Sequence, residues 1–148
     1  MGLAYGIAGI IVIVDQLTKW KIVSNIALHD EITIIPGLLR LTYVKNSGAA
    51  FGLFPGRATV FVISALLIIA LIILLRQEIV REGKLAIVAS GLLLGGAVGN
   101  LIDRLRGGYV VDFIGVFSWP IFNVADMSVV AAAILMVLVV FTSEGAPW

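Results

Sequence analysis

Four stretches of the chain are apolar and uncharged, over residues 1–14, 58–75, 85–102 and 127–143. A helix of about eighteen residues reaches roughly 27 Å, close to the hydrocarbon thickness of a membrane. The first stretch is shorter, but it continues in helical register to Trp20, an interfacial ending. We therefore predict a membrane all-α fold with four transmembrane helices, at about residues 2–22, 58–75, 85–102 and 124–143.

Residues 23–57 are not apolar enough to span and form the predicted extramembrane loop. In this loop Leu39, Leu41 and Tyr43 alternate with polar residues at period two, after the Pro36-Gly37 turn. The pattern predicts a small interfacial β-hairpin or sheet that rests on the membrane surface. The next loop, residues 76–84, is short and charged, and residues 103–123 form the third loop.

The topology of four spans places the first and third loops on one side of the membrane and both termini on the other. Counted together with Lys19 and Lys21 at the end of the first span, the two loops hold seven Lys or Arg residues, against three in the second loop. Counted alone, this bias would place the first and third loops in the cytoplasm. The first loop is long, however, and its charges can be committed to a site, so charge bias alone does not set the orientation.

A secretory leader is the alternative for residues 1–22. That segment lacks a basic start and a small-x-small cleavage site before Asp15. We expect a retained first helix, and so a single integral membrane domain over residues 1–148.

The composition agrees with a membrane protein and argues against several classes of function. The chain is 61% apolar and 13% charged, with a mean hydropathy of +1.14, far from the roughly 45–50% apolar usage of soluble domains. It has no cysteine and one histidine, His29, so disulfides, thiol catalysis and zinc sites are not expected. The net charge of +1 comes with scattered basic residues, so we expect no nucleic-acid binding.

The third apolar stretch carries Gly91, Gly95 and Gly99 at four-residue spacing. Small residues at this spacing let another helix approach closely. Packing within one four-helix bundle is favoured over homodimerisation, and we expect a monomer.

Four of the five aspartates lie at or beside the ends of spans on the shared side: Asp15, Asp103, Asp112 and Asp126. Acidic residues at a helix centre cost about 2.5–3.5 kcal/mol on insertion scales, so each is a candidate functional residue. An i,i+4 ion pair with Lys19 and a direct role are both open for Asp15. Asn100, Asp103 and Arg104 share one helical face, which favours a structural anchor.

Asp112 has apolar neighbours on both sides, and Asp126 stands at the start of the fourth span, where Asn123 could cap the helix. Two close, buried carboxyls would share one proton. One could then activate water as a base while the other protonates a leaving amine, as in aspartic proteases. Two aspartates fourteen positions apart are a weak indication by themselves.

Five short segments occur in order along the predicted spans. They are Asp15-Gln16-Leu17-Thr18-Lys19, Asn46-Ser47-Gly48-Ala49-Ala50-Phe51-Gly52, Gly95-Gly96-Ala97-Val98-Gly99-Asn100-Leu101-Ile102-Asp103-Arg104, Val110-Val111-Asp112-Phe113 and Phe122-Asn123-Val124-Ala125-Asp126. With these segments the chain resembles the bacterial lipoprotein signal peptidases (signal peptidase II) along nearly its whole length.

The resemblance implies a multi-pass aspartyl endopeptidase of the bacterial inner membrane, with its site on the periplasmic side and no cofactor or metal. Its substrate would be a diacylglyceryl-modified prolipoprotein, cut on the amino side of the lipidated cysteine, with membrane lipid as the other partner. The family's catalytic aspartates map onto Asp112 and Asp126. Its supporting residues map onto Asp15, Lys19, Asn46, Gly48, Asn100, Asp103, Arg104 and Asn123.

Two other classes of function stay open at this point. A small proton or cation transporter could use membrane aspartates as a relay, although acids confined to one side disfavour a path through the membrane. A non-catalytic membrane assembly protein would explain the glycines but not the acids.

Overall fold

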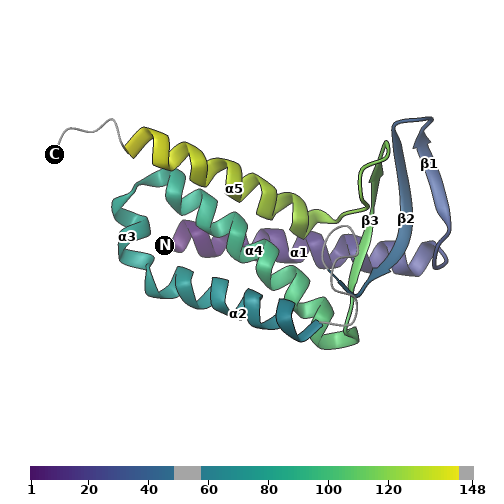
Figure 1. Cartoon of the computed structure of the whole chain (residues 1–148), viewed down its shortest axis with the longest axis horizontal. Helices are drawn as coiled ribbons and strands as arrows, with labels where there is room; N and C mark the ends of the chain where they lie inside the picture. Colours follow the sequence, from purple (N-terminus) through teal and green to yellow (C-terminus); the bar gives the residue numbers. More distant parts are fainter. Residues whose placement is uncertain (49–57, 144–148) are drawn as a thin grey trace.

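The computed structural model describes residues 1–48 and 58–143. The helices lie side by side, with a small sheet across one end and the beginning of α1 and end of α5 towards the other (Figure 1). Part of one expected motif, residues 49–52, lies outside the described residues. The elements are α1 (Gly2–Asn25), β1 (Glu31–Ile35), β2 (Leu39–Asn46), α2 (Ala58–Leu74), α3 (Arg76–Arg81), α4 (Lys84–Gly107), β3 (Val110–Val116) and α5 (Val124–Ser143).

Among the described residues, three helices are long and apolar enough to cross a membrane: Gly2–Asn25, Lys84–Gly107 and Val124–Phe141. The remaining apolar helix, Thr59–Leu74, is shorter than these three. Three of the four predicted helices thus have the length and composition of a span, and the fourth span stays a prediction. The charged segment after α2, predicted as a loop, contains the short helix α3.

α4 continues past the predicted end at residue 102 as far as Gly107. Gly108 then takes a left-handed conformation, with φ of 73°, and its N–H bonds the Arg104 carbonyl at 2.9 Å. A glycine just beyond the last turn is a common helix stop because it adopts positive φ without steric cost. Asp103 and Arg104 therefore lie in the final turns of the helix.

The predicted hairpin is confirmed, and the sheet has one strand more than the sequence indicated. β1 and β2 pair antiparallel, with Glu31 opposite Thr42. β3 then pairs antiparallel with β2, with Asp112 opposite Val44, in a segment that we predicted as loop. The signal for β3 was present in its run of β-branched and aromatic residues, Tyr109 to Ile114.

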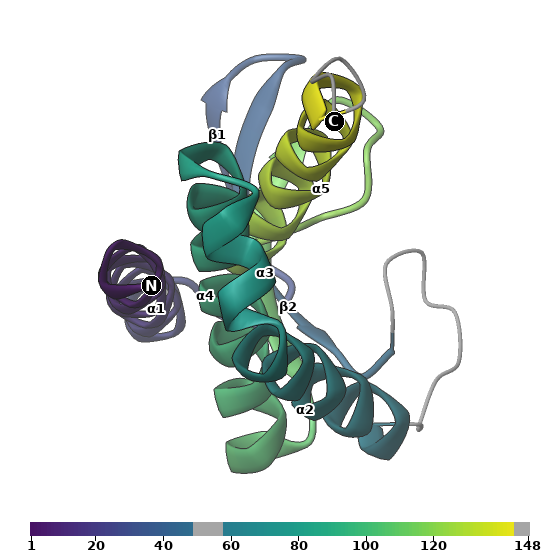
Figure 2. The same cartoon turned by 90° about the vertical axis from the view of Figure 1, so that its left-hand side faces the viewer.

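α4 lies at the centre of the bundle, between α1, α5 and α2 (Figure 2). A Cβ atom added at Gly91 would meet the Ala4 carbonyl of α1 at 2.8 Å, and one at Gly95 would meet Ile11 at 2.7 Å. On the α5 side, a Cβ at Gly96 would lie 2.5 Å from the Ala125 carbonyl. The glycines therefore allow helices of the same chain to pack closely, which is the role that we favoured from their spacing.

Gly96→Ala should lower the free energy of unfolding by about 1–3 kcal/mol, because the new methyl group meets backbone that cannot yield cheaply. The measurement is the unfolding transition in detergent micelles. Gly9→Ala is the matched control, since a Cβ there meets nothing within 4 Å. Equal stability of Gly96→Ala and the control would contradict the close-packing argument.

Candidate active site

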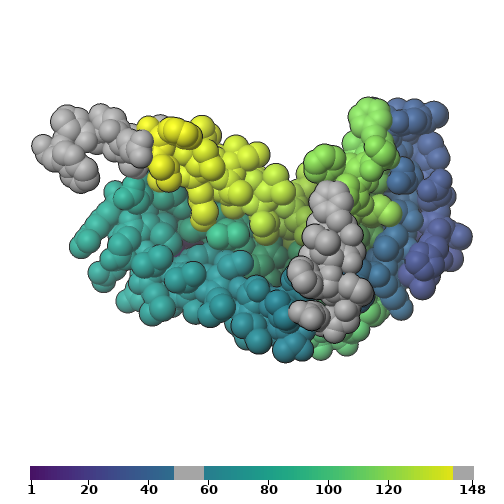
Figure 3. Space-filling model, viewed as in Figure 1, coloured from purple at the N-terminus to yellow at the C-terminus, as the bar shows by residue number. Residues whose placement is uncertain are grey.

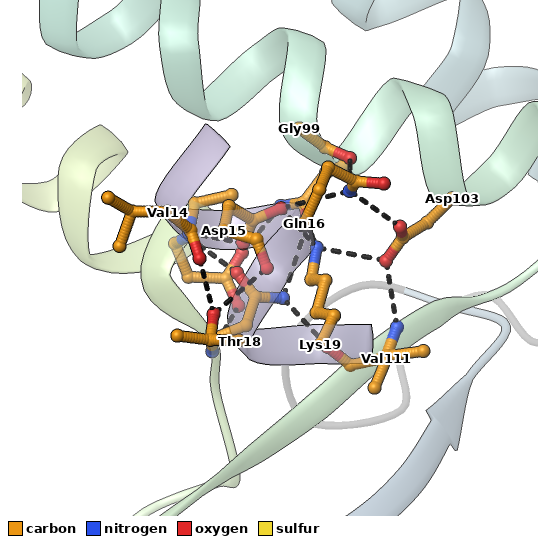
Figure 4. A network of polar contacts seen from close by, with 12 residues as sticks. Val14, Asp15, Gln16, Thr18, Lys19, Gly99, Asp103 and Val111 are labelled. Carbon is orange, nitrogen blue, oxygen red and sulfur yellow. Dashed lines mark hydrogen bonds and ion pairs between the residues drawn. The ribbon is translucent and has the colours of Figure 1, made fainter. Parts of the chain in front are cut away.

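Lys19, a residue that is 3% exposed, is the centre of a polar network between α1 and α4. Its Nζ lies 2.8 Å from Asp15 Oδ2 and 2.9 Å from Asp103 Oδ2, and it donates to Asn100 Oδ1 at 3.0 Å. Figure 4 shows the lysine between its two carboxylates. An ammonium group has three donors, and each has an acceptor here, which offsets the desolvation of the buried charge.

The two carboxylates that bind Lys19 each accept a further bond from the backbone of another element. Asp15 Oδ1 accepts the Ala125 N–H at 3.0 Å, at the start of α5. Asp103 Oδ2 accepts the Val111 N–H at 3.1 Å, on β3. Ala125 and Val111 directly precede Asp126 and Asp112, so the network fixes the backbone beside both candidate catalytic residues.

Gln16 belongs to this network, although it is not among the site residues that we predicted. Its Nε2 donates to Asp103 Oδ1 at 2.9 Å (Figure 4). Its Oε1 accepts from Arg106 Nη1 at 3.0 Å. The indications were its place in the segment Asp15-Gln16-Leu17-Thr18-Lys19, beside Asp15, and its position one turn before Lys19. The ion pair between Asp15 and Lys19, one of the two roles left open for Asp15, is present at 2.8 Å.

Asp112 and Asp126 lie on either side of Asn123. Asp112 is 3% exposed; its Oδ1 accepts from Asn123 Nδ2 at 2.7 Å and its Oδ2 from Asn46 Nδ2 at 2.8 Å. Asp126 Oδ1 accepts from Asn100 Nδ2 at 2.8 Å, and its Oδ2 accepts the Asn123 N–H at 3.2 Å. Neutral amides thus hold both carboxyls, and they come from three places: β2 (Asn46), α4 (Asn100) and the residue just before α5 (Asn123).

Asn123 also caps α5, as its position predicted. Its Oδ1 accepts the Asp126 N–H at 2.9 Å while the Asp126 carboxylate bonds back to the Asn123 N–H. This reciprocal pair is a capping box, formed here by Asn and Asp. The helix start therefore determines where the Asp126 carboxyl lies.

Burial raises the pKa of Asp112 to about 6, and the nearby Asp126 carboxyl acts in the same direction. The hydrogen bond from Asn46 opposes this change, because it stabilises the charged form. Asp112 can therefore hold a proton at a pH where an ordinary aspartate is charged. One proton-bearing and one charged carboxyl would suit combined acid and base chemistry.

Both carboxyls line a cavity of about 740 Å³. The surface is hollowed between α5 and the sheet on the side shown in Figure 3. Apolar residues dominate the wall from Trp119 to Ile134, and the polar part includes Asn46, Gly48, Asn100 and Arg104. The cavity can accept an apolar ligand and present it to the two aspartates.

The ten residues singled out from the sequence gather at this end of the bundle. Gly48 lies beside Asn46, whose Oδ1 accepts the Gly48 N–H at 3.0 Å. Arg104 lines the cavity and makes no ion pair with a described residue. Over residues 1–48 and 58–143, no group of three His, Cys, Asp or Glu side chains is arranged as metal ligands.

Comparison with known proteins places this arrangement in a family. The family model described as signal peptidase (SPase) II matches residues 7–142. The lipoprotein signal peptidase of Halothermothrix orenii is 38% identical over 142 residues, covering 96% of this chain and 97% of the relative. That of Symbiobacterium thermophilum is 46% identical over 138 residues, covering 89% and 90%.

Two solved structures of bacterial membrane enzymes, determined by the in meso method, share the fold. The structure at 2.3 Å resolution superposes with a TM-score of 0.86 at 32% identity, over 98% of this chain and 91% of the other. The structure at 1.9 Å resolution has a TM-score of 0.80 at 33% identity, over 95% and 93%. The chain therefore belongs to the signal peptidase II family, the lipoprotein signal peptidases.

Proposed function

We propose that this protein is an aspartyl endopeptidase that removes the signal peptide from diacylglyceryl-modified prolipoproteins, on the amino side of the lipidated cysteine. The observation that supports this best is the meeting of Asp112 and Asp126 in one cavity, on either side of Asn123. Family membership supports the peptidase activity, and the carboxyl pair supports the aspartyl mechanism.

In the proposed reaction the two carboxyls share one proton. The charged carboxyl takes a proton from water, which attacks the carbonyl carbon of the scissile bond, while the other carboxyl gives its proton to the carbonyl oxygen. When the resulting gem-diol collapses and the C–N bond breaks, the carboxyl that took the proton from water gives it to the leaving amine. The other carboxyl regains its proton from a hydroxyl of the gem-diol. Asp112 is the better proton donor at the start, because burial keeps it protonated to about pH 6. The amides of Asn46, Asn100 and Asn123 keep both carboxyls in place without adding charge.

The cavity wall supports a substrate that reaches the site from lipid. The wall follows α5 from Met127 through Val130 to Ile134, an apolar path that starts at Asp126. In our proposal the signal helix and acyl chains stay in the bilayer, and the peptide bond is delivered to the carboxyls. The protein would act as a monomer in the inner membrane, with the sheet end on the outer side.

A transporter that relays protons between aspartates is less well supported. Asp15, Asp103, Asp112 and Asp126 belong to one network at the sheet end of the bundle. A relay across the membrane needs acids at several depths.

Asp112→Asn and Asp126→Asn should each lower the cleavage rate by at least about 100-fold, because each carboxyl has its own acid or base duty. The assay is a gel shift of a lipid-modified prolipoprotein with purified enzyme. Asp30→Asn is the matched control, since Asp30 is exposed and lies in a loop. Near-normal cleavage by either site variant would reject the assignment.

A prolipoprotein that lacks the diacylglyceryl group should be cut about 100-fold more slowly than the modified form. The acyl chains fix the depth and register of the scissile bond, and orientation can supply several kcal/mol of a barrier. Rates are compared at saturating substrate in one detergent. Equal rates would indicate an enzyme that recognises the peptide alone.

Asn46→Ala should move the alkaline limb of the pH–rate profile to higher pH. The Asn46 hydrogen bond lowers the pKa of Asp112, so its loss raises that pKa and the acid keeps its proton to higher pH. Activity is lost as pH rises through the pKa of the acid. Asn25→Ala is the control, because Asn25 lies at an exposed helix end; it should leave the alkaline limb of the pH–rate profile in place. A move of that limb to lower pH in Asn46→Ala would contradict the assignment of Asp112 as the proton donor.

A further inference from the structure

Arg104 is held in an unusual way for a cation near two carboxyls. Its side chain lines the cavity that contains Asp112 and Asp126, yet it makes no ion pair with a described residue. Its guanidinium carbon lies instead 4.9 Å from the centre of the Phe61 ring. Lys19, by contrast, has both of its carboxylate partners within 3 Å.

A cation over the face of an aromatic ring is attracted by the negative charge of that face. The guanidinium group is planar, and its five N–H donors point outward in its own plane. A ring that holds the cation through its face does not use these donors. Arg104 can therefore be fixed in place and still donate to a ligand in the cavity.

Phe61 is well placed for this task. It lies in the first turn of α2, and α4, which carries Arg104, is the main packing partner of α2. The contact thus joins two helices at the level of the carboxyls. Phe61 itself does not line the cavity, so it can act on the substrate only through Arg104.

We propose that Phe61 is a positioning residue of the peptidase: its ring holds the Arg104 guanidinium in the cavity wall, where the N–H donors bind carbonyl oxygens of the substrate peptide. This inference rests on the proposed function. Phe61 belongs to none of the motifs that relate the chain to its family, and its role comes from the ring contact and the cavity.

The test compares kcat/KM of Phe61→Leu, Phe61→Tyr and Phe61→Trp on lipid-modified prolipoprotein. Phe61→Leu should lower kcat/KM about ten-fold, as expected for the loss of a partly desolvated cation–π contact. Tyr and Trp keep an aromatic face and should retain activity within about two-fold of wild type. Phe141→Leu is the matched control, a phenylalanine that is 71% exposed near the other end of the bundle.

A double-mutant cycle separates positioning from general stability. In an Arg104→Gln background, measured in single turnover with enzyme in excess, Phe61→Leu should have no further effect, because its target is gone. An unchanged ten-fold loss in that background, or equal losses for the Leu and Trp variants, would overturn the inference. Full activity of Phe61→Leu would overturn it while leaving the proposed function intact, whereas an inactive wild-type enzyme would overturn both.

Discussion

One buried ammonium group holds the polar end of the bundle together. Lys19 comes from the first helix, and its three acceptors come from α1 and α4. Such a charge is tolerated away from water only when its partners are complete, and loss of one partner typically costs about 3–5 kcal/mol. The contact therefore fixes how α1 and α4 meet, and the site is built on that junction.

Asp15 and Asp103, the two carboxylates that bind Lys19, also hold the backbone next to the candidate catalytic residues. Each uses one oxygen for the lysine and accepts a further bond from the backbone N–H of the residue that precedes a candidate catalytic residue. A buried Asp15 would be unfavourable without these bonds, and with them it links α1 to α5. The network places β3 and α5 relative to each other while its own carboxylates are fully engaged. Asp15 and Asp103 are thus used for structure, and Asp112 and Asp126 are the pair of carboxyls that faces the cavity.

Much of this could be predicted from the sequence, and the gaps have physical reasons. Apolar length predicts helices directly, and the Pro36-Gly37 turn identifies the hairpin. β3 was missed because it is buried on both faces and lacks the alternation of a half-exposed strand. Gln16 and Phe61 were missed because their roles depend on partners far along the chain, Asp103 and Arg104, which only the packing of α1 and α2 against α4 brings close.

The distribution of the site residues was easier to predict than their contacts. The span order places Asp15, Asn46, Asp103 and Asp126 on one side without any knowledge of geometry. The order of the spans cannot indicate that Asp103 bonds Val111 rather than its neighbour Arg104. This choice of partner depends on where α4 ends, and Gly108 determines the end of the helix.

The sheet that carries Asp112 is closed along one edge only. Beyond β3, Phe122 bonds the backbone of Phe113 and Ile114, whereas all five residues of β1 are exposed at the other edge. An open strand edge is a template for pairing with another chain. Here β1 is five residues long, its register shifts near its end, and Glu31 pairs with Arg40. A short, irregular and charged edge hinders sheet-to-sheet joining between copies, even where molecules crowd in the plane of a membrane.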